Sequence, residues 1–300
     1  METMTPPAPP LTDTACWICK AHSKTPFKKS NLGGTVNSKD FQITDSNYGV
    51  TGELIRCTEC GFIQTTSFSS VLSFYEKMED HTYEATRLER QIQARELLLR
   101  LKPYAPKGRL LDIGAGSGIL LEEALNLGYQ AEGIDPSDWL TQQGRKRGFI
   151  VHEGVLPHPQ ANGPYDVATL IDVIEHVSNP MDVLKEIRKV LSPNGYLFVV
   201  TPDVSSIAAH LLGKRWWHFR IAHIGYFNKS NLDLALVKAG FQKKLVFRPS
   251  WYFPADYLFI RLKKYLPFLK HIQPGAFLKK ILIPLNLFDS IGAIYQVGPL

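Results

Sequence analysis

The sequence predicts an α/β protein with a doubly wound, mainly parallel sheet and a small N-terminal metal-binding module. Apolar runs of strand length alternate with helix-length amphipathic segments, which predicts the sheet. Two C-x-x-C pairs near the N-terminus predict the module. We therefore expect a tail over 1–12, a metal-binding module over 13–79 and a larger domain over 80–300.

The composition is that of an ordinary globular chain, with 44% hydrophobic and 21% charged residues. No apolar run approaches the roughly 20 residues of a membrane span. Residues 1–10 are rich in proline and lack the basic and apolar regions of a secretory signal, so we expect a disordered tail and a cytoplasmic location. The net charge of +6 suits an anionic substrate or surface and does not by itself indicate nucleic acid.

The four cysteines have the spacing of a structural zinc site. They are Cys16, Cys19, Cys57 and Cys60. Each pair lets two thiolates reach one ion from a tight turn, and two such turns complete a tetrahedral site. Free thiols are the alternative, whereas a redox pair is disfavoured because neither pair opens a helix of a βαβ unit. Between the pairs, 41–44 and 53–56 are predicted to be short strands.

A helix is predicted over 84–101, where apolar residues recur at helical spacing and prolines follow. We expect this helix to lead into the larger domain. It either closes over a bound ligand or packs on the sheet as a linker.

A glycine-rich stretch lies at the start of the larger domain. An apolar run ends at Asp112 and is followed by Gly114, Gly116 and Gly118, which predicts a strand, a tight bend and a helix. Glycines allow a positive φ and a close approach of the backbone to a ligand. The dinucleotide fingerprint G-x-G-x-x-G is absent, because Ile119 stands where its third glycine would be.

A second acid follows the next predicted strand, which covers 131–134. Asp135 ends this strand at close to the ~20-residue spacing where doubly wound folds carry a ribose-binding acid. Capping of the following helix is the alternative role for this side chain.

These motifs together resemble the class I S-adenosylmethionine (SAM)-dependent methyltransferases, whose first motif is an acid followed by G-x-G-x-G. The resemblance covers roughly residues 87–242. It implies a seven-stranded sheet with six parallel strands and one antiparallel edge strand, expected at 292–297. It also implies SAM as cofactor, with Val155 standing where an adenine-binding acid is usual. The implied cofactor-binding residues are Asp112, Gly114, Gly116, Gly118, Asp135, Pro136, Val155 and Asp172.

Acidic residues and a histidine follow the strand predicted at 165–171, where ligands bind in open α/β sheets. The run Asp172, Glu175, His176 resembles the acid-x-x-E-H run of ubiquinone-biosynthesis O-methyltransferases, some of which bind a divalent ion there. Asp172 is one methylene shorter than the usual Glu. Three roles stay open for this run: hydrogen bonds that fix the loop, general base catalysis and metal binding.

An aromatic and basic run over 213–227 is predicted to be a substrate lid. Its W-W-H and H-x-x-Y-F letters are similar to a run in one subgroup of small-molecule methyltransferases, which also carries an N-terminal cysteine-rich module. His223 is the first candidate for a general base, and the predicted catalytic residues are His223, His176 and Glu175. Trp216 and Trp217 are either substrate platforms or core anchors.

Residues 251–290 are predicted to form a basic amphipathic helical insertion. The predicted apolar stripe consists of Leu258, Leu262, Tyr265 and Leu269. Residues 251–300 hold six basic and two acidic side chains, a balance of +4. Such helices lie on anionic membranes or turn their apolar face to a core, so peripheral membrane contact through 255–283 is one of two interpretations.

The predicted function is SAM-dependent methyl transfer to O, N or C of a small molecule, with a sugar or lipid-linked intermediate as acceptor. An rRNA or tRNA methyltransferase that grips RNA through the zinc module is the alternative within enzymes. It is disfavoured because residues 1–60 lack a dense Lys/Arg patch. A non-catalytic membrane-surface protein that retains the fold is the third interpretation.

Overall fold

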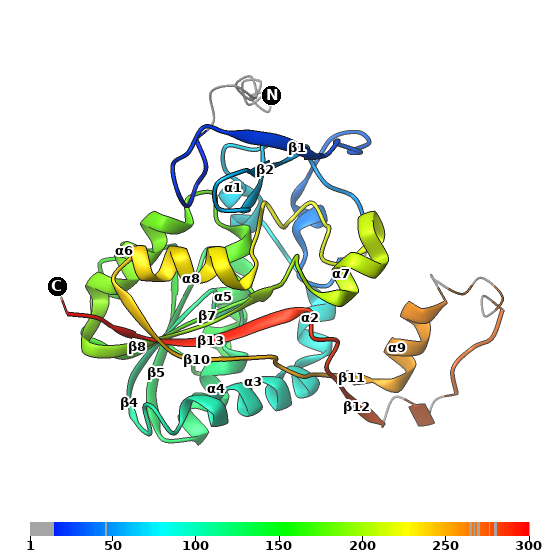
Figure 1. The fold of residues 1–300 in the computed structure, drawn as a ribbon. Coiled ribbons are helices and arrows are strands. Elements are labelled where there is room, and N and C mark those ends of the chain that lie inside the picture. Colours follow the sequence, from blue (N-terminus) through cyan, green and yellow to red (C-terminus); the bar gives the residue numbers. More distant parts are fainter. Residues whose placement is uncertain are drawn as a thin grey trace, which may run out of the picture.

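A seven-stranded sheet forms the centre of the computed structural model, in the order β10-β13-β8-β7-β4-β5-β6 (Figure 1). The structure describes residues 15–45, 47–263, 266, 268, 271–275, 277–278 and 281–299, so the predicted tail over 1–12 lies outside the described residues. The strands are β4 (Gly108–Ile113), β5 (Tyr129–Asp135), β6 (Val151–Glu153), β7 (Tyr165–Ile171), β8 (Leu191–Pro202), β10 (Phe241–Phe247) and β13 (Ser290–Val297).

Six strands run one way and β13 runs the other, as the sequence predicted. β13 is antiparallel to both β8 and β10, and the other pairs from β8 to β6 are parallel. The antiparallel strand is not at the edge, however, because β10 pairs on its outer side.

Helices cover both faces of the sheet, and the alternation of side chains along each strand divides the core between them. Leu110 packs in the cluster of α3 (Arg87–Leu101) and α4 (Ile119–Asn126). Its neighbour Leu111 packs in the cluster of α6 (Pro180–Val190) and α8 (Lys229–Lys238). This opposite placement of consecutive residues follows from the period of two in a strand. The helix after β5 is α5 (Asp138–Lys146).

The N-terminal module is built on β1 (Lys24–Lys28), β2 (Leu54–Cys57) and β3 (Ile63–Thr65). The prediction of a strand at 53–56 corresponds to β2. The strand predicted at 41–44 is wrong: η1 (Ser38–Phe41) is a 3-10 turn there, with a capping box on Asn37 that favours a helical turn over an extended chain. The fourth strand of this sheet is β9 (Gly225–Tyr226), which comes from the predicted lid and pairs with β3.

Two short helices, α1 (Leu72–Glu76) and α2 (His81–Ala85), join the module to α3. The helix predicted over 84–101 is therefore divided, with the break at Thr86. The Asp80 side chain accepts the N–H of Tyr83 and caps α2. Further along the chain, the Asn228 side chain caps α8.

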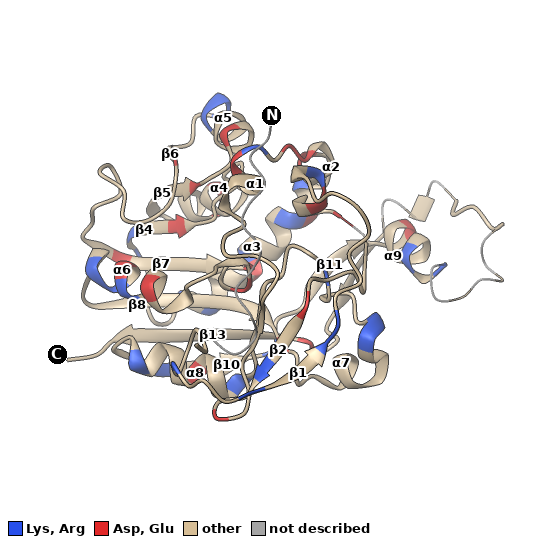
Figure 2. Ribbon diagram, turned by 90° about the horizontal axis from the view of Figure 1, so that it is seen from above, with Lys and Arg blue, Asp and Glu red and all other residues tan. Residues whose placement is uncertain are grey.

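Residues 251–290 form one described helix between two paired strands. These elements are β11 (Trp251–Pro254), α9 (Ala255–Leu262) and β12 (Leu282–Leu285). Tyr265 and Leu269 of the predicted stripe lie outside the described residues. Figures 1 and 2 show α9 standing off the body of the protein, on the same side as α7 (Ile207–Leu212). Among the described residues, no helix is long and apolar enough to span a bilayer.

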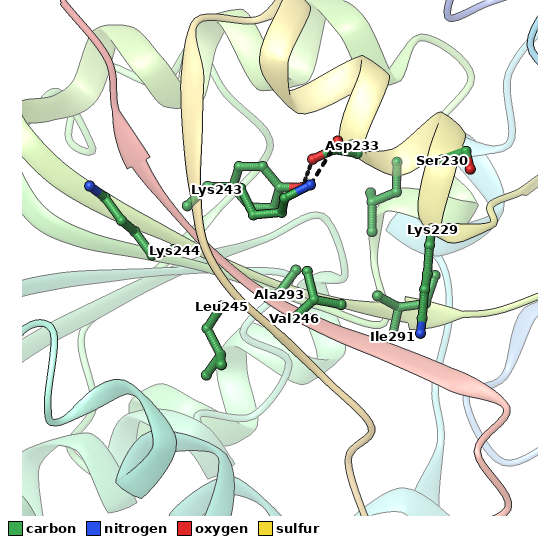
Figure 3. A pocket seen from close by; sticks show the side chains of 11 residues that line it. Lys229, Ser230, Asp233, Lys243, Lys244, Leu245, Val246, Ile291 and Ala293 are labelled. Atoms are coloured by element: carbon green, nitrogen blue, oxygen red, sulfur yellow. Dashed lines mark hydrogen bonds and ion pairs between the residues drawn. The ribbon is translucent and has the colours of Figure 1, made fainter.

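A surface groove lies at the β10 edge of the sheet, between α8, β10 and β13 (Figure 3). An ion pair between Lys243 and Asp233, with 2.9 Å from Nζ to Oδ2, lies on its wall. No predicted site residue lines this groove.

The close packing of α4 on the sheet depends on a residue without a side chain at position 133. A Cβ on Gly133 would lie 2.4 Å from Cβ of Ala115 in the bend before α4 and 3.1 Å from Cδ1 of Leu121 in α4. Gly133→Ala is expected to lower the free energy of unfolding by about 1–3 kcal/mol through overpacking, as measured by urea unfolding. Gly33→Ala is the control, because a Cβ at that position would have no neighbour within 4 Å. Equal stabilities of the two variants would contradict the packing argument.

Candidate active site

The bend after β4 has a backbone that only glycine adopts freely. Gly114, Gly116 and Gly118 have φ angles of 77°, 54° and 78°. A Cβ on Gly114 would lie 2.4 Å from Cγ2 of Val173, and one on Gly118 would lie 2.6 Å from the Phe149 ring. Both positive φ and close neighbours therefore require glycine in this bend.

The two predicted acids lie at the tips of adjacent strands beside the bend. Asp112 accepts a hydrogen bond of 2.6 Å from the Thr169 hydroxyl. Asp135 accepts two backbone N–H groups at 2.8 Å each, from Gly116 and Ser137. Asp135 therefore faces the bend and braces it. Its helix-capping role is not observed, because Ser137 is the N-cap of α5.

Both carboxyl groups are buried, with 4% of Asp112 and 6% of Asp135 exposed. Burial raises the pKa of Asp112 to about 7, and the charge of Asp135 adds to this effect. Burial raises the pKa of Asp135 to about 6, although its two backbone N–H donors favour the carboxylate.

The residues around this bend fit an adenosyl group that carries no phosphate. Two acids supply acceptors for hydroxyl groups, and a phosphate would meet like charge here. Gly154 N–H donates to the carbonyl of Asp135 at 2.9 Å, which places the predicted adenine-side loop next to the same strand end. Val155 in that loop is 45% exposed, and Pro136 is half-buried.

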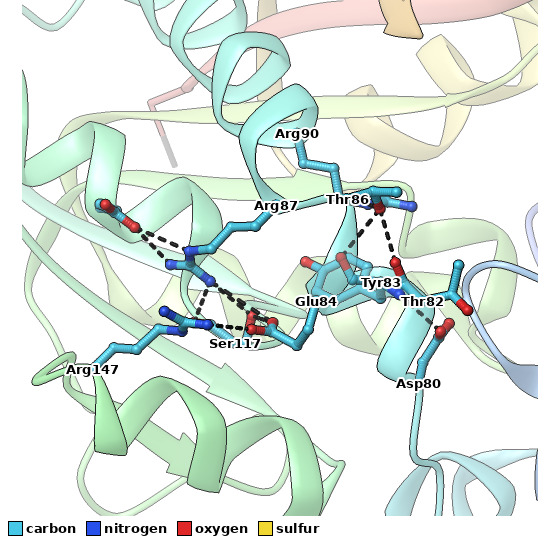
Figure 4. A network of polar contacts seen from close by, with 10 residues as sticks. Asp80, Thr82, Tyr83, Glu84, Thr86, Arg87, Arg90, Ser117 and Arg147 are labelled. Atoms are coloured by element: carbon cyan, nitrogen blue, oxygen red, sulfur yellow. Dashed lines mark hydrogen bonds and ion pairs between the residues drawn. The ribbon is translucent and has the colours of Figure 1, made fainter. Parts of the chain in front are cut away.

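Helix α2 covers the bend with side chains that sequence reasoning did not assign to the site (Figure 4). The Tyr83 hydroxyl lies 3.0 Å from the position of a Cβ on Gly116. Glu84 accepts hydrogen bonds from the Ser117 hydroxyl and from Arg147, the second at 2.9 Å. Arg87 pairs with Glu122 at 2.7 Å. Tyr83 and Glu84 of α2 and Arg87 of α3 therefore lie against the bend.

A second group of side chains lies at the carboxyl ends of β7 and β8. One ligand atom each of Glu175, His176 and His223 lie within 4.8 Å of one another. The His176 and His223 rings are 4.7 Å apart. The structure thus brings the three predicted catalytic residues together. Asp172 does not belong to this group of ligand atoms.

Two buried polar atoms of this group make no hydrogen bond among the described residues. Nδ1 of His176 lies 2.8 Å from the Ala222 carbonyl, so this nitrogen carries the proton and donates, and Nε2 keeps the lone pair. The Tyr75 hydroxyl lies 2.6 Å from the same Nδ1. Among the described residues, Nδ1 of His223 and Oε1 of Glu175 have no hydrogen-bond partner.

Burial keeps this group uncharged. It raises the pKa of Glu175 well above the usual range, with the charge of Asp172 as the second cause. It lowers the pKa of His176 to about 3 and that of His223 well below the usual range. Two neutral imidazoles can accept a proton from an acceptor molecule. If Glu175 lost its proton to a bound cation, its carboxylate and the two imidazole nitrogens would also be a donor set that divalent transition metals take.

Asp172 lies apart, at the end of β7, in a conformation that only few non-glycine residues adopt. Its φ is 52°, and its N–H donates to the Val200 carbonyl at 2.9 Å. Solvent reaches the side chain, yet desolvation by the protein around it raises its pKa to about 7, against the opposing charge of Arg90. Backbone strain of this kind clusters at functional sites.

Comparison with known proteins identifies the family. Residues 85–245 match the family model described as "Methyltransferase domain". The chain belongs to the methyltransferase domain family.

Two curated relatives of this methyltransferase chain are named ubiquinone biosynthesis O-methyltransferase. The one from Caulobacter sp. (strain K31) is 33% identical over 101 residues, which are 31% of this chain and 40% of the relative. The one from Caulobacter vibrioides is 35% identical over 100 residues, with the same coverage. The match thus spans about two fifths of these relatives.

A solved structure supports the fold. A chain of the complex between the Haloferax volcanii Trm112 methyltransferase activator and a methyltransferase has a TM-score of 0.53 and 15% identity. The match covers 73% of this chain and 94% of that chain.

The predicted lid contributes strand β9 to the sheet of the N-terminal module, through its pairing with β3. Trp216 is fully buried, so it is a core anchor and not a substrate platform. Trp217 donates from Nε1 to Oδ2 of Asp289 at 2.8 Å. The His218 ring stacks on that of His223, with centroids 5.7 Å apart.

The four cysteines come together as their spacing predicted. Their sulfur atoms lie within 4.8 Å of one another, with 3.5 Å between Cys16 and Cys60 and 3.4 Å between Cys19 and Cys57. Four thiols from two tight turns are the donor set of a closed tetrahedral zinc site.

Because the pKa of Asp135 is raised, we expect the affinity for the ligand to depend on pH. Only the carboxylate accepts two hydroxyl groups, so the affinity for S-adenosylhomocysteine should fall about tenfold per pH unit below about 6. Isothermal titration between pH 5 and 8 measures this slope. Asp135→Asn should bind more weakly and lose the slope. A wild-type affinity that is constant over this range would contradict the assignment.

Proposed function

We propose that this protein transfers a methyl group from SAM to an O, N or C nucleophile of a small-molecule acceptor. The observation that carries the proposal is the glycine bend between the buried Asp112 and Asp135, next to a pair of neutral imidazoles. The proposed cofactor-binding residues are Asp112, Gly114, Gly116, Gly118, Asp135, Pro136, Val155 and Asp172.

The cofactor, when bound, supplies an electrophilic methyl group on a sulfonium. Asp135 would accept the ribose hydroxyls while it still holds the bend through the Gly116 N–H. The arginines of α3, Arg87 and Arg90, lie on the same side of the bend and would attract the carboxylate of the amino-acid part. Together these residues would hold the cofactor at the bend.

His223 is the proposed general base. Its Nδ1 is buried and has no partner among the described residues, so it is free to accept a hydrogen bond from the nucleophile. Burial lowers the pKa of the ring, which keeps it neutral, and a bound acceptor would have to offset this effect for the ring to take the proton. His176, fixed by the Ala222 carbonyl, and Glu175, held by the Thr201 hydroxyl at 2.9 Å, would position the acceptor.

Orientation contributes more to the rate than the base does. Alignment of nucleophile, carbon and sulfur supplies about 7–11 kcal/mol, whereas a general base supplies about 10²–10⁴-fold, or about 3–5 kcal/mol. The matched relatives bear the name of O-methyltransferases of ubiquinone biosynthesis, which favours an oxygen nucleophile. A sugar or a lipid-linked intermediate remains our proposed acceptor class.

The proposal is tested with purified protein, SAM labelled on its methyl group, and fractionated metabolite extracts, followed by mass spectrometry. We expect a labelled product in at least one fraction. Absence of any labelled product together with absence of S-adenosylhomocysteine binding would contradict the proposal.

With the acceptor in hand, His223→Gln tests the base. We expect kcat to fall by about 10²–10⁴-fold, because Gln cannot take up the proton, while the affinity for S-adenosylhomocysteine stays unchanged. Steady-state kinetics and calorimetry measure the two effects. Unchanged kcat would exclude His223 as the base.

We also propose that the four cysteines hold a structural zinc ion. Because β2 ends at Cys57 and β3 pairs with the lid strand β9, the metal would support the lid as well as the module. Metal analysis should find about one zinc per chain. Cys57→Ser should lose the zinc and lower Tm, whereas the neighbouring Thr58→Ser should retain both. Zinc-free protein with an unchanged Tm would contradict this role.

Residues 255–283 are proposed to contact a membrane surface peripherally. Exposed apolar side chains in this segment, among them Phe268 and Phe277, support the contact.

A further inference from the structure

Exposed apolar side chains concentrate on one projecting part of the protein. Among the described residues, half of the exposed large apolar side chains lie between 255 and 288. They are Ile260, Leu262, Phe268, Ile272, Phe277, Ile281, Ile283, Leu287 and Phe288. Contiguous exposure on this scale marks an interaction site, whereas single exposed apolar residues do not.

A second apolar face lies on α7, far away in the sequence. Leu211 is 83% exposed and Ile207 is 72% exposed, and their spacing of four residues places them on one side of the helix. In α7, Ala209 is buried and Leu212 packs against the cluster around Trp216, whereas Ile207 and Leu211 face outward.

The loop at residues 48–49 joins the two faces. The Arg261 guanidinium of α9 lies over the Tyr48 ring, 5.1 Å from its centroid. A Cβ on the next residue, Gly49, would lie 3.0 Å from the carbonyl oxygen of Lys214, just after α7. Figures 1 and 2 show α7 and α9 on the same side of the body. We call residues 207–215 and the described part of 255–288 the docking surface.

The docking surface is basic. Its described cations are Lys214, Arg215, Arg261 and Lys263, and its one described acid is Asp256 (Figure 2). Basic side chains around exposed apolar ones match an anionic lipid surface, where the apolar groups enter the headgroup boundary and the cations meet the phosphates.

The docking surface is continuous with the lid that carries the proposed base. Phe288 is exposed on it, and the next residue, Asp289, accepts the Trp217 indole N–H. Oδ2 of Asp289 also lies 3.4 Å from Nε2 of His218, whose ring stacks on His223. A bilayer on the docking surface would therefore lie next to the lid.

We propose that the docking surface, made of α7 and the described part of 255–288, binds an anionic bilayer and turns the lid toward it. The inference rests on the proposed peripheral contact of 255–283 and adds α7 as its second half. It does not depend on the methyl-transfer chemistry.

The experiment is co-sedimentation of the full chain with vesicles of phosphatidylcholine and phosphatidylglycerol, compared with phosphatidylcholine alone. We expect binding to the anionic vesicles that weakens between about 0.1 and 0.5 M salt, since cations contribute to it. No binding to anionic vesicles would overturn the inference. Self-association through the surface without vesicles, seen by sedimentation velocity and lost in the α7 variant, would also overturn it and assign a second copy as occupant.

Three matched double variants separate the halves of the surface. They are Ile207→Ser with Leu211→Ser in α7, Ile272→Ser with Phe277→Ser in the segment, and Leu88→Ser with Ile150→Ser as an exposed apolar control elsewhere. Each of the first two should weaken vesicle binding by about tenfold or more, and the control should not. All three should bind S-adenosylhomocysteine like the wild type, which shows that they fold.

The outcomes distinguish the inference from the proposals on which it rests. If only the segment variant loses vesicle binding, the peripheral contact stands and the role of α7 is overturned. If vesicle binding follows the prediction but S-adenosylhomocysteine does not bind even the wild type, the docking surface stands and the proposed catalytic function fails.

Discussion

The geometry of the candidate site depends on the hydrogen bonds of the Asp135 carboxylate. One oxygen accepts the N–H of Gly116 in the bend, and the other accepts the N–H of Ser137, which starts α5. The carbonyl of the same residue accepts the N–H of Gly154. One residue at a strand end thus fixes the bend, the next helix and the adjacent loop. Each carboxylate oxygen has a further lone pair, so Asp135 can keep both of these hydrogen bonds and still accept ribose hydroxyl groups.

The second half of the site depends on the pairing between β3 and β9. This pairing attaches the lid to the cysteine-bearing module. The N–H of Ile224 then donates to the Glu175 carbonyl at 2.9 Å, while its own carbonyl accepts the N–H of Thr65. The residue before Ile224 is His223, which is thereby held against His176. The module therefore helps to build the site, in addition to holding its own cysteines together.

Local sequence features predicted much of this arrangement. The apolar runs predicted the strands that carry Asp112 and Asp135 at their ends, and the glycines predicted the bend, because each of these features depends on neighbouring residues. The position of β13 inside the edge and the pairing of β9 with β3 depend on partners far away in the sequence, so no local pattern indicated them. Tyr83 and Glu84 also contact the bend from a distant part of the sequence, so no local pattern indicated this contact either. At Phe41, where the strand predicted at 41–44 would begin, the 3-10 turn capped by Asn37 takes the place of an extended chain.

The most direct test asks whether the bend and Asp135 bind the adenosyl group, because Tyr83 of α2 lies against this bend. A crystal structure of the protein with S-adenosylhomocysteine should show the ribose hydroxyls within hydrogen-bond distance of the Asp135 carboxylate, with the Tyr83 side chain moved away from Gly116. A ligand bound elsewhere, with Tyr83 still on Gly116 and Asp135 without contact to it, would contradict the account.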